Sequence, residues 1–288
     1  MKIPFVDLKA QYNSLKIEID NSIQDVINES AFIKGKYVEK FEREYAEAYG
    51  VKHCISCANG TDAIYISLKA LGIGFGDEVI TVANTWISTA ETISQTGAKP
   101  IFVDIEPDYY TIDVNKIEEK ITVKTKAIIP VHLYGQSCDM DKINKIAKKN
   151  KLKIIEDCAQ AQGATYKKRY VGTLGDAGCF SFYPTKILGA YGDGGFITVK
   201  SKKIYEKMRR IRFYGIEGLN KKDKFFGKYY SNEQGINSRI DEMQLSILNI
   251  KLLQVNKFIK KRIKIANYYK NKLKNTSLTL PNIRTYNK

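Results

Sequence analysis

One lysine stands out because of its position between two kinds of sequence. Lys186 follows an apolar run, Gly178–Phe182, and precedes the glycine-rich segment Gly189–Gly195. A lysine at this point leaves a packed sheet at the carboxyl end of a strand, where glycines permit unusual backbone conformations and let a cofactor approach. Its amine is therefore placed to form a Schiff base with an aldehyde. The plainer interpretation is a solvated loop lysine, as most such lysines are.

Two adjacent acids end another apolar run and suggest a partner for that lysine. Glu156 and Asp157 directly follow Ile154-Ile155, so they lie at the carboxyl end of a strand and one of them faces the site. A nearby carboxylate favours the protonated form of a pyridine nitrogen by about 1 to 3 pKa units, which lets the ring act as an electron sink. We predict Asp157 for this role. Alternatively, Asp157 caps the helix that follows it.

A glycine turn after a third apolar run offers a place for a phosphate. Gly60 and Thr61 lie between the run ending at Cys57 and a helical pattern, and the start of a helix presents free N–H groups and a partial positive charge. An ordinary helix cap and turn would look the same. The turn gains meaning only in combination with Lys186 and Asp157.

A sheet must position these residues, and the chain predicts one. From about residue 50 to 200, β-rich runs alternate with helical patterns, which is typical of an α/β fold with a mostly parallel sheet and helices on both faces. Ligands then bind at the carboxyl ends of the strands. The predicted strands are His53–Cys57, Glu78–Val82, Pro100–Asp104, Ala127–Val131, Lys153–Glu156, Gly178–Phe182 and Gly195–Val199. The predicted helices are roughly Thr61–Leu71, Ser88–Thr96, Asn115–Glu119 and Met140–Asn150.

The last third of the chain is predicted to be mainly helical. A helical pattern runs from Ser201 through Phe213, and a polar loop covers roughly Gly215–Gly235. One long helix, about Arg239–Leu273, is so apolar near its start that it should be buried between layers and bridge two domains. The chain then ends in a strand-like segment, Leu278–Asn282. We expect residues 1–238 to form a large domain and residues 239–288 to form the bridging helix and the start of a partial small C-terminal domain.

The composition excludes several classes of protein. Hydrophobic residues make up 43% of the chain and charged residues 27%, with no apolar run long enough to cross a bilayer. The net charge is +16, but the lysines are spread along the chain, which favours solvated faces over nucleic-acid binding. A basic surface still attracts a diphosphate-bearing substrate. The start of the chain lacks a secretory pattern, so we expect a soluble, cytoplasmic protein with no membrane partner.

The cysteines argue against a disulfide framework or a metal site. There are five, an odd number, and only Cys54 and Cys57 form a CxxC pair. Both lie in the predicted strand His53–Cys57, where residues three apart point to opposite faces. We therefore predict neither a redox pair nor a metal ligand set.

Several stretches together resemble the DegT-type sugar aminotransferases, which use pyridoxal 5'-phosphate on the fold of the aspartate aminotransferases (fold type I). The resemblance covers nearly the whole chain and implies a large sheet of seven strands. The matching stretches are Ile3–Gln11, Cys54–Ala63, Gly76–Trp86, Thr125–Asp139, Ile154–Gly163, Ser181–Gly195 and Gly235–Leu248.

The resemblance implies a role for each residue of the site. Lys186 would hold the cofactor through a Schiff base, Asp157 would pair with the ring nitrogen, and Gln160 would lie near the oxygen substituent of the ring. Trp86 would stack on the pyridine face, although it could equally be a buried core tryptophan. The phosphate would be held by Gly60, Thr61, Ser181 and Asn237.

The same resemblance implies partners and a reaction. In the family the residue at Asn237 reaches into the site of the neighbouring subunit, so a homodimer with shared active sites is expected. Glutamate is expected to donate an amino group to a nucleotide-diphosphate keto sugar, for cell-surface polysaccharide or glycoconjugate biosynthesis. The free amine of Lys186 would shuttle protons as general base and acid.

Three alternatives remain. A sugar dehydratase of the same fold would by resemblance have histidine at the position of Lys186. A nicotinamide-dependent oxidoreductase is disfavoured, because Gly72–Gly76 follows a helix and lacks the GxGxxG order after a strand. A cofactor-binding regulator or an inactive remnant is also open, because relatives continue well beyond the end of this chain. An uncovered long helix would then promote association of the chain with itself.

Overall fold

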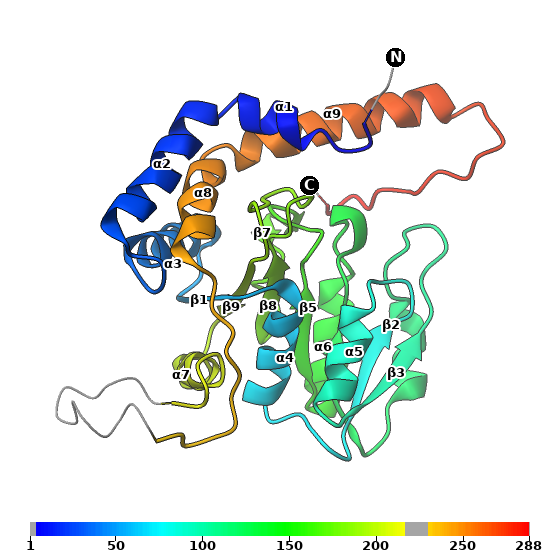
Figure 1. Ribbon diagram of the computed structural model, residues 1–288. Helices are drawn as coiled ribbons and strands as arrows, with labels where there is room; N and C mark the ends of the chain where they lie inside the picture. Colours follow the sequence, from blue (N-terminus) through cyan, green and yellow to red (C-terminus); the bar gives the residue numbers. More distant parts are fainter. Residues whose placement is uncertain (1–3, 217–229, 288) are drawn as a thin grey trace.

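A seven-stranded sheet forms the centre of the computed structural model, which describes residues 4–216 and 230–287 (Figure 1). The strand order is β1-β9-β8-β5-β4-β2-β3. Strand β9 is antiparallel to both of its neighbours, whereas β8, β5, β4, β2 and β3 pair in parallel. The predicted α/β class with a mostly parallel sheet is confirmed. The strands are β1 (His53–Cys57), β2 (Glu78–Val82), β3 (Lys99–Val103), β4 (Thr125–Ile129), β5 (Lys153–Asp157), β8 (Ala177–Ser181) and β9 (Gly195–Val199).

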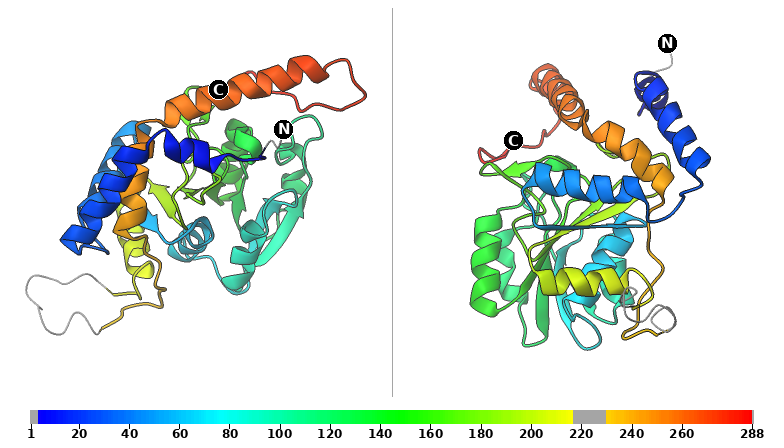
Figure 2. Two further views of the ribbon diagram at one scale, coloured as in Figure 1. Left: turned by 45° about the horizontal axis from the view of Figure 1, so that its top comes forward. Right: turned by 90° about the vertical axis from the view of Figure 1, so that its left-hand side faces the viewer.

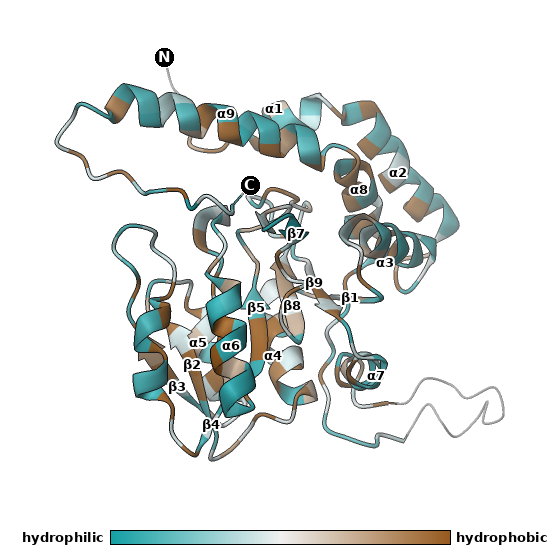
Figure 3. Ribbon diagram, turned by 180° about the vertical axis from the view of Figure 1, so that it is seen from behind, coloured by the Kyte–Doolittle hydropathy of each residue, from teal (hydrophilic) through white to brown (hydrophobic). Residues whose placement is uncertain are grey.

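The strands at the centre of the sheet are buried on both faces. Every residue of β9 and most residues of β5 and β8 are buried, and Figure 3 shows hydrophobic residues among the central strands, whereas α6 is largely hydrophilic on its outer side. Strands of a parallel sheet are rich in apolar residues because helices cover both faces of the sheet. Each of the seven predicted strands begins and ends within two residues of the observed strand. A hairpin of two-residue strands, β6 (Thr165–Tyr166) and β7 (Arg169–Tyr170), was not predicted.

Helices cover both faces of the sheet (Figure 2). On one face pack α4 (Gly60–Ala70), α5 (Ser88–Gln95) and α7 (Lys202–Ile211). On the other face pack α3 (Lys36–Tyr49), α6 (Met140–Asn150) and α8 (Glu242–Leu252). Cys57 belongs to the first core and Cys54 to the second, which confirms that the two thiols point to opposite faces.

Two helix predictions are wrong. The segment Asn115–Glu119 forms two single 3-10 turns, η1 (Val114–Lys116) and η2 (Glu118–Lys120), because it is too short for a stable α-helix. The long helix Arg239–Leu273 is two helices, α8 and α9 (Val255–Leu273), which are separated at Leu253 and Gln254. The start of α8 is indeed buried, but α9 is largely exposed. The change from a buried to an exposed environment coincides with the break.

The two ends of the chain return to the body of the molecule. Helix α2 (Lys16–Glu29), which follows α1 (Leu8–Asn13), lies beside α8, and Ile19 of α2 packs on Ile247. The strand predicted at Leu278–Asn282 is wrong, because the tail instead folds back onto the β6–β7 hairpin. There the ring of Tyr286 lies 4.6 Å from that of Tyr166.

Some predictions are not settled by the fold. Most of the predicted loop Gly215–Gly235 lies outside the described residues, and the domain boundary after residue 238 stays a prediction. Across residues 4–216 and 230–287, no helix combines the length and the apolar character that spanning a bilayer requires.

Candidate active site

A cavity of about 470 Å³ opens where the carboxyl ends of β1, β2, β4, β5 and β8 meet. Its volume falls within the range usual for small-molecule sites, about 300 to 1,000 Å³. The structure brings seven of the eight predicted site residues to its wall and leaves Asn237 outside. The seven are Gly60, Thr61, Trp86, Asp157, Gln160, Ser181 and Lys186.

Lys186 lies on the loop that joins β8 to β9, and hydrogen bonds within this loop hold its shape. The backbone N–H of Lys186 donates to the carbonyl of Tyr183 at 2.8 Å. At the base of the loop, the N–H of Phe182 donates to Gly194 O and the N–H of Ala190 to Phe182 O, both at 2.7 Å. The side chain is half-buried, and burial lowers the pKa of Lys186, while Asp157 acts in the opposite direction. The interpretation as a freely solvated lysine is therefore wrong.

Asp157 is the last residue of β5, and its carboxylate lies in the wall of the cavity. Oδ2 accepts a hydrogen bond from the hydroxyl of Thr89 at 2.9 Å, and Oδ1 accepts one from the N–H of Ala159 at 3.1 Å. Burial raises the pKa of Asp157, and these two hydrogen bonds oppose the rise. Residues 158–164 form turns, so the helix that Asp157 was alternatively expected to cap is absent from this segment.

The start of α4 lies in the wall of the cavity and is held closely against β8. Asn59 caps the helix, its side-chain oxygen accepting from the N–H of Asp62 at 2.8 Å. A Cβ atom on Gly60 would come within 2.8 Å of the Cβ of Ser181, so this close approach requires glycine. Thr61 is fixed by a 2.8 Å hydrogen bond between its hydroxyl and that of Ser88. The start of α4 and the hydroxyl residues Thr61, Ser88 and Ser181 thus line the same cavity, and the start of a helix is a usual place for an anion.

Trp86 and Gln160, which both carry planar groups, also line the cavity. Trp86 is 74% exposed, so it is not the buried core tryptophan that was the alternative. Its ring is available to a planar ligand. Gln160 is held by its Oε1 atom, which accepts from the N–H of Tyr134 at 2.9 Å. Both residues follow the ends of strands, β2 and β5 respectively.

Asn237 is exposed and lies outside the cavity of its own chain. It forms an isolated β-bridge with Phe213. The next residue, Ser238, anchors the segment, because its hydroxyl donates to Asp62 Oδ2 at 2.6 Å and accepts from the N–H of Ala58 at 3.0 Å. A role of Asn237 in the site of another subunit stays a prediction.

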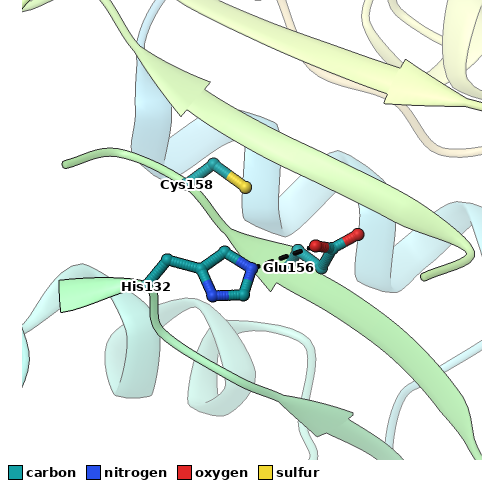
Figure 4. Close-up of side chains that lie close together, drawn as sticks. All are labelled: His132, Glu156 and Cys158. Atoms are coloured by element: carbon teal, nitrogen blue, oxygen red, sulfur yellow. Dashed lines mark hydrogen bonds and ion pairs between the residues drawn. The ribbon is translucent and has the colours of Figure 1, made fainter. Parts of the chain in front are cut away.

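A buried cluster lies directly behind Asp157 and consists of His132, Glu156 and Cys158 (Figure 4). His132 Nδ1 accepts from the N–H of Cys138 at 3.1 Å, so Nε2 carries the proton and donates to Glu156 Oε2 at 3.0 Å. Burial would raise the pKa of Glu156, but its hydrogen bonds outweigh burial and hold that pKa below its usual value. Glu156 also accepts backbone N–H groups from Gly172, Leu174 and Gly175.

Glu156 therefore holds the surrounding loops, whereas Asp157 lines the cavity. Sequence reasoning missed Thr89, which holds Asp157, and Ser88, which holds Thr61. Asn59, in contrast, was expected as a turn or capping residue before a helix, and it caps α4. The available signal for the two missed residues was the pair of hydroxyl side chains near the start of the predicted helix Ser88–Thr96.

The fold and the cavity define a class: an α/β protein that presents a partly buried amine and a buried carboxylate at the carboxyl edge of its sheet. Residues 13–286 match the DegT/DnrJ/EryC1/StrS aminotransferase family. The chain belongs to this family and is therefore an enzyme of the aminotransferase class. The family resemblance seen in the sequence is thereby confirmed.

Similar proteins include relatives with quite different names. The chain is 48% identical over 269 residues to a "pleiotropic regulatory protein" of Geobacillus stearothermophilus, covering 93% of this chain and 70% of the relative. It is 47% identical over 281 residues to a dTDP-3-amino-3,6-dideoxy-alpha-D-galactopyranose transaminase of Aneurinibacillus thermoaerophilus, covering 98% and 75%. The crystal structure of DesV of S. venezuelae in complex with a ketimine intermediate superposes with a TM-score of 0.93 at 37% identity, covering 100% of this chain and 75% of that one.

Proposed function

We propose that this chain uses pyridoxal 5'-phosphate to transfer an amino group from glutamate to the ketone of a nucleotide-diphosphate-linked sugar. The observation that carries the proposal is the meeting of Lys186, Asp157 and the start of α4 around one cavity. Membership of an aminotransferase family supports it. The transaminase from Aneurinibacillus thermoaerophilus, whose name specifies a dTDP-linked amino sugar, supports the substrate class.

The residues of the cavity fit this cofactor. When bound, the cofactor supplies an aldehyde for an amine and a ring that withdraws electrons. Gly60, Thr61 and Ser181 lie together at the start of α4, where the N–H groups of a first helical turn could bind the phosphate. Asp157 is a buried acceptor for a ring N–H, and Trp86 offers an exposed aromatic face.

Lys186 would move the protons of the reaction. Because burial lowers its pKa, a larger fraction of the amine is neutral near neutral pH than for an ordinary lysine. A neutral Nζ can attack a carbonyl, and the same atom can later take a proton from the donor Cα and return it. Asp157, whose carboxylate is fixed by Thr89 and Ala159, would pair with the ring nitrogen of the cofactor and favour its protonated form.

The test combines attachment and turnover. We expect added cofactor to give an absorbance band that borohydride removes, with the added mass on the peptide that contains Lys186. We expect ¹⁵N from glutamate to appear in one member of a panel of nucleotide-linked keto sugars. Lys186→Ala should lose both results, whereas the exposed Lys203→Ala should retain both. Failure of the cofactor to attach to Lys186 in the unaltered chain would refute the proposal.

A regulatory role is the second candidate, because the relative from Geobacillus stearothermophilus is named a pleiotropic regulatory protein. A regulator of this kind would bind the cofactor through the same residues without amine transfer. Attachment to Lys186 with no ¹⁵N transfer to any sugar would favour this candidate. The alternative of a sugar dehydratase is disfavoured by the lysine at position 186.

We further propose that the protein acts as a homodimer in which Asn237 completes the neighbouring site. Asn237 is exposed and lies outside its own cavity, which suits such a role. Mixing inactive Lys186→Ala subunits with weakened Asn237→Ala subunits should restore activity, because one site of each mixed dimer then has both intact residues. If activity stays at the level of the separate variants, Asn237 does not act across subunits.

The product would serve the biosynthesis of cell-surface polysaccharide or another glycoconjugate, and we place the enzyme in the cytoplasm. The five cysteines are all unpaired and buried, which suits a reducing compartment. The net charge of +16 favours encounter with a doubly phosphorylated substrate.

A further inference from the structure

We propose that Lys251, a buried lysine on α8, is a positioning residue that holds the Lys186 loop in place. The Lys186 loop is the segment between β8 and β9, residues 182–194. This inference rests on the proposed role of Lys186, but Lys251 itself does not line the cavity.

The environment of Lys251 is unusual for a lysine. Its side chain is only 1% exposed, although lysines are almost never fully buried without a charged partner. Nζ donates to the carbonyl oxygen of Gly189 at 2.7 Å and lies 4.3 Å from the centre of the Tyr191 ring. Within residues 4–216 and 230–287, no carboxylate forms an ion pair with it. Both of its contacts are to the Lys186 loop.

The amine is costly to bury, and that cost suggests a specific use. A methionine could fill nearly the same space without removing a charged group from water. What the amine adds is a hydrogen bond from a charged donor and a cation–π contact, both directed at the loop. Burial lowers the pKa of Lys251 to about 8, which agrees with a partly desolvated amine.

The point of attachment is close to Lys186 along the chain. Gly189 follows Lys186 by three residues, and a Cβ on Gly189 would lie 2.3 Å from the carbonyl oxygen of Pro184. The loop therefore folds tightly on itself here. A displacement of the Gly189 carbonyl would also displace the backbone at Lys186. The neighbouring N–H of Ala190 is already bonded to Phe182 O at the base of the loop.

Helix α8 holds the loop at a second point. Gln244 Oε1 accepts from the N–H of Tyr191 at 2.9 Å. Gln244 precedes Lys251 by seven residues, so the two side chains leave the same face of the helix. One face of α8 thus carries a donor and an acceptor, each matched to a backbone group of the Lys186 loop.

The consequence for Lys186 follows from its burial. If the bond to Gly189 is removed, the loop can relax and water can reach the Lys186 amine. The pKa of Lys186, lowered by burial, then returns toward its ordinary value. A residue that served only global stability would not produce this change while the protein remained folded.

The test uses the cofactor-free chain, so it does not depend on turnover. In Lys251→Met, hydrogen exchange of the Ala190 and Tyr191 amides should become about tenfold faster, the scale expected for loss of one hydrogen bond from a charged donor. The midpoint of Lys186 acylation against pH should move upward. Lys251→Arg, which keeps a charged donor, should restore both values, and the exposed Lys257→Met should change neither.

The outcomes separate this inference from the proposed function. Unchanged exchange and an unchanged acylation midpoint in folded Lys251→Met, as judged by circular dichroism, would overturn the positioning role even if the enzyme is active. If Lys251→Met does not fold, Lys251→Gln provides a neutral donor. Faster exchange at Ala190 and Tyr191 with rescue by arginine would support the role even if no amine acceptor is found.

Discussion

Asp157 is surrounded by protein donors, yet its carboxylate still lines the cavity. Thr89 and Ala159 each occupy one of its oxygens and fix its orientation. Each carboxylate oxygen can accept more than one hydrogen bond, so a further donor from a ligand can be accommodated. A cationic ring would also relieve the cost of burying the charge.

Replacing this carboxylate by an amide should separate attachment from turnover. In Asp157→Asn we expect the cofactor to remain fixable to Lys186 by borohydride, but kcat should fall by roughly a hundredfold or more, because the amide cannot stabilise a positive ring nitrogen. Steady-state kinetics and peptide mass measurements check this prediction. The exposed Asp25→Asn serves as the control, and undiminished kcat in Asp157→Asn would remove the assigned role.

Gly60 gives a second prediction for single residues. Its replacement by alanine places a Cβ within 2.8 Å of Ser181, so the start of α4 must move away from β8. We expect the dissociation constant for the cofactor to rise by about tenfold or more, since such overpacking usually costs about 1 to 3 kcal/mol. Absorbance titration measures it. Gly74→Ala is the matched control, because a Cβ there meets only one ordinary contact at 3.5 Å.

The sequence predicted the residues with reactive or special chemistry better than the residues that hold them. Lys186, Asp157 and Gly60 each have an ordinary alternative when taken alone, but they are recognisable in combination because all three lie at or just after the ends of predicted strands. Thr89 was missed because a threonine in a helix is ordinary until the fold brings it to Asp157. Such contacts between distant segments leave no local pattern.

Among the elements, α8 links several parts of the molecule. It contacts the Lys186 loop through Gln244 and Lys251, and it packs on both α2 and α3. The Glu242 carboxylate, at its start, accepts the N–H groups of Gly35 at 2.6 Å, Tyr37 at 2.8 Å and Val38 at 3.2 Å. A negative charge thus compensates the unpaired donors at the start of α3.

Loss of that carboxylate should destabilise the fold. Glu242 is fully buried, so in Glu242→Ala three backbone donors lose their acceptor. We expect the free energy of unfolding to fall by about 2 to 4 kcal/mol. Urea denaturation measures the change, with Glu39→Gln, an exposed acid on α3, as the control expected within about 0.5 kcal/mol. A loss equal to that of the control would show that water replaces the carboxylate.

The sheet was predictable because parallel strands are short apolar runs bounded by turns. The separation of α8 from α9 was not, since neither Leu253 nor Gln254 is a helix breaker. It arises where the chain leaves the buried layer beside α3 and continues as an exposed helix. The packing of the C-terminal tail on Tyr166 likewise depends on contacts between residues far apart in sequence.

For the whole molecule, Lys251 should give stability a distinct pH dependence. Burial lowers its pKa to about 8, compared with 10.5 for an ordinary lysine. Between these values the unfolded chain binds more protons, so this group makes stability rise with pH. The difference in unfolding free energy, unaltered chain minus Lys251→Met, should therefore grow by about 1 to 3 kcal/mol across the window. Urea denaturation at several pH values checks this, and a flat difference would contradict it.

The comparison with the variant is needed because buried cysteines act in the opposite direction. Burial raises the pKa of Cys54, Cys57 and Cys158, so above about pH 9 the unfolded thiols lose protons first and stability falls with pH. Both proteins contain these thiols, so their contribution cancels in the difference.

Cys54 and Cys57 point to opposite faces of the sheet, and this arrangement has a practical consequence. Each thiol is buried, so a reagent dissolved in water can modify it only after the layer above it has moved aside. Cys57 lies under α4 and α7, whereas Cys54 lies under α3 and α8. Two side chains of one strand, three residues apart, would therefore report separately on the opening of the two sides of the sheet, without any label being introduced.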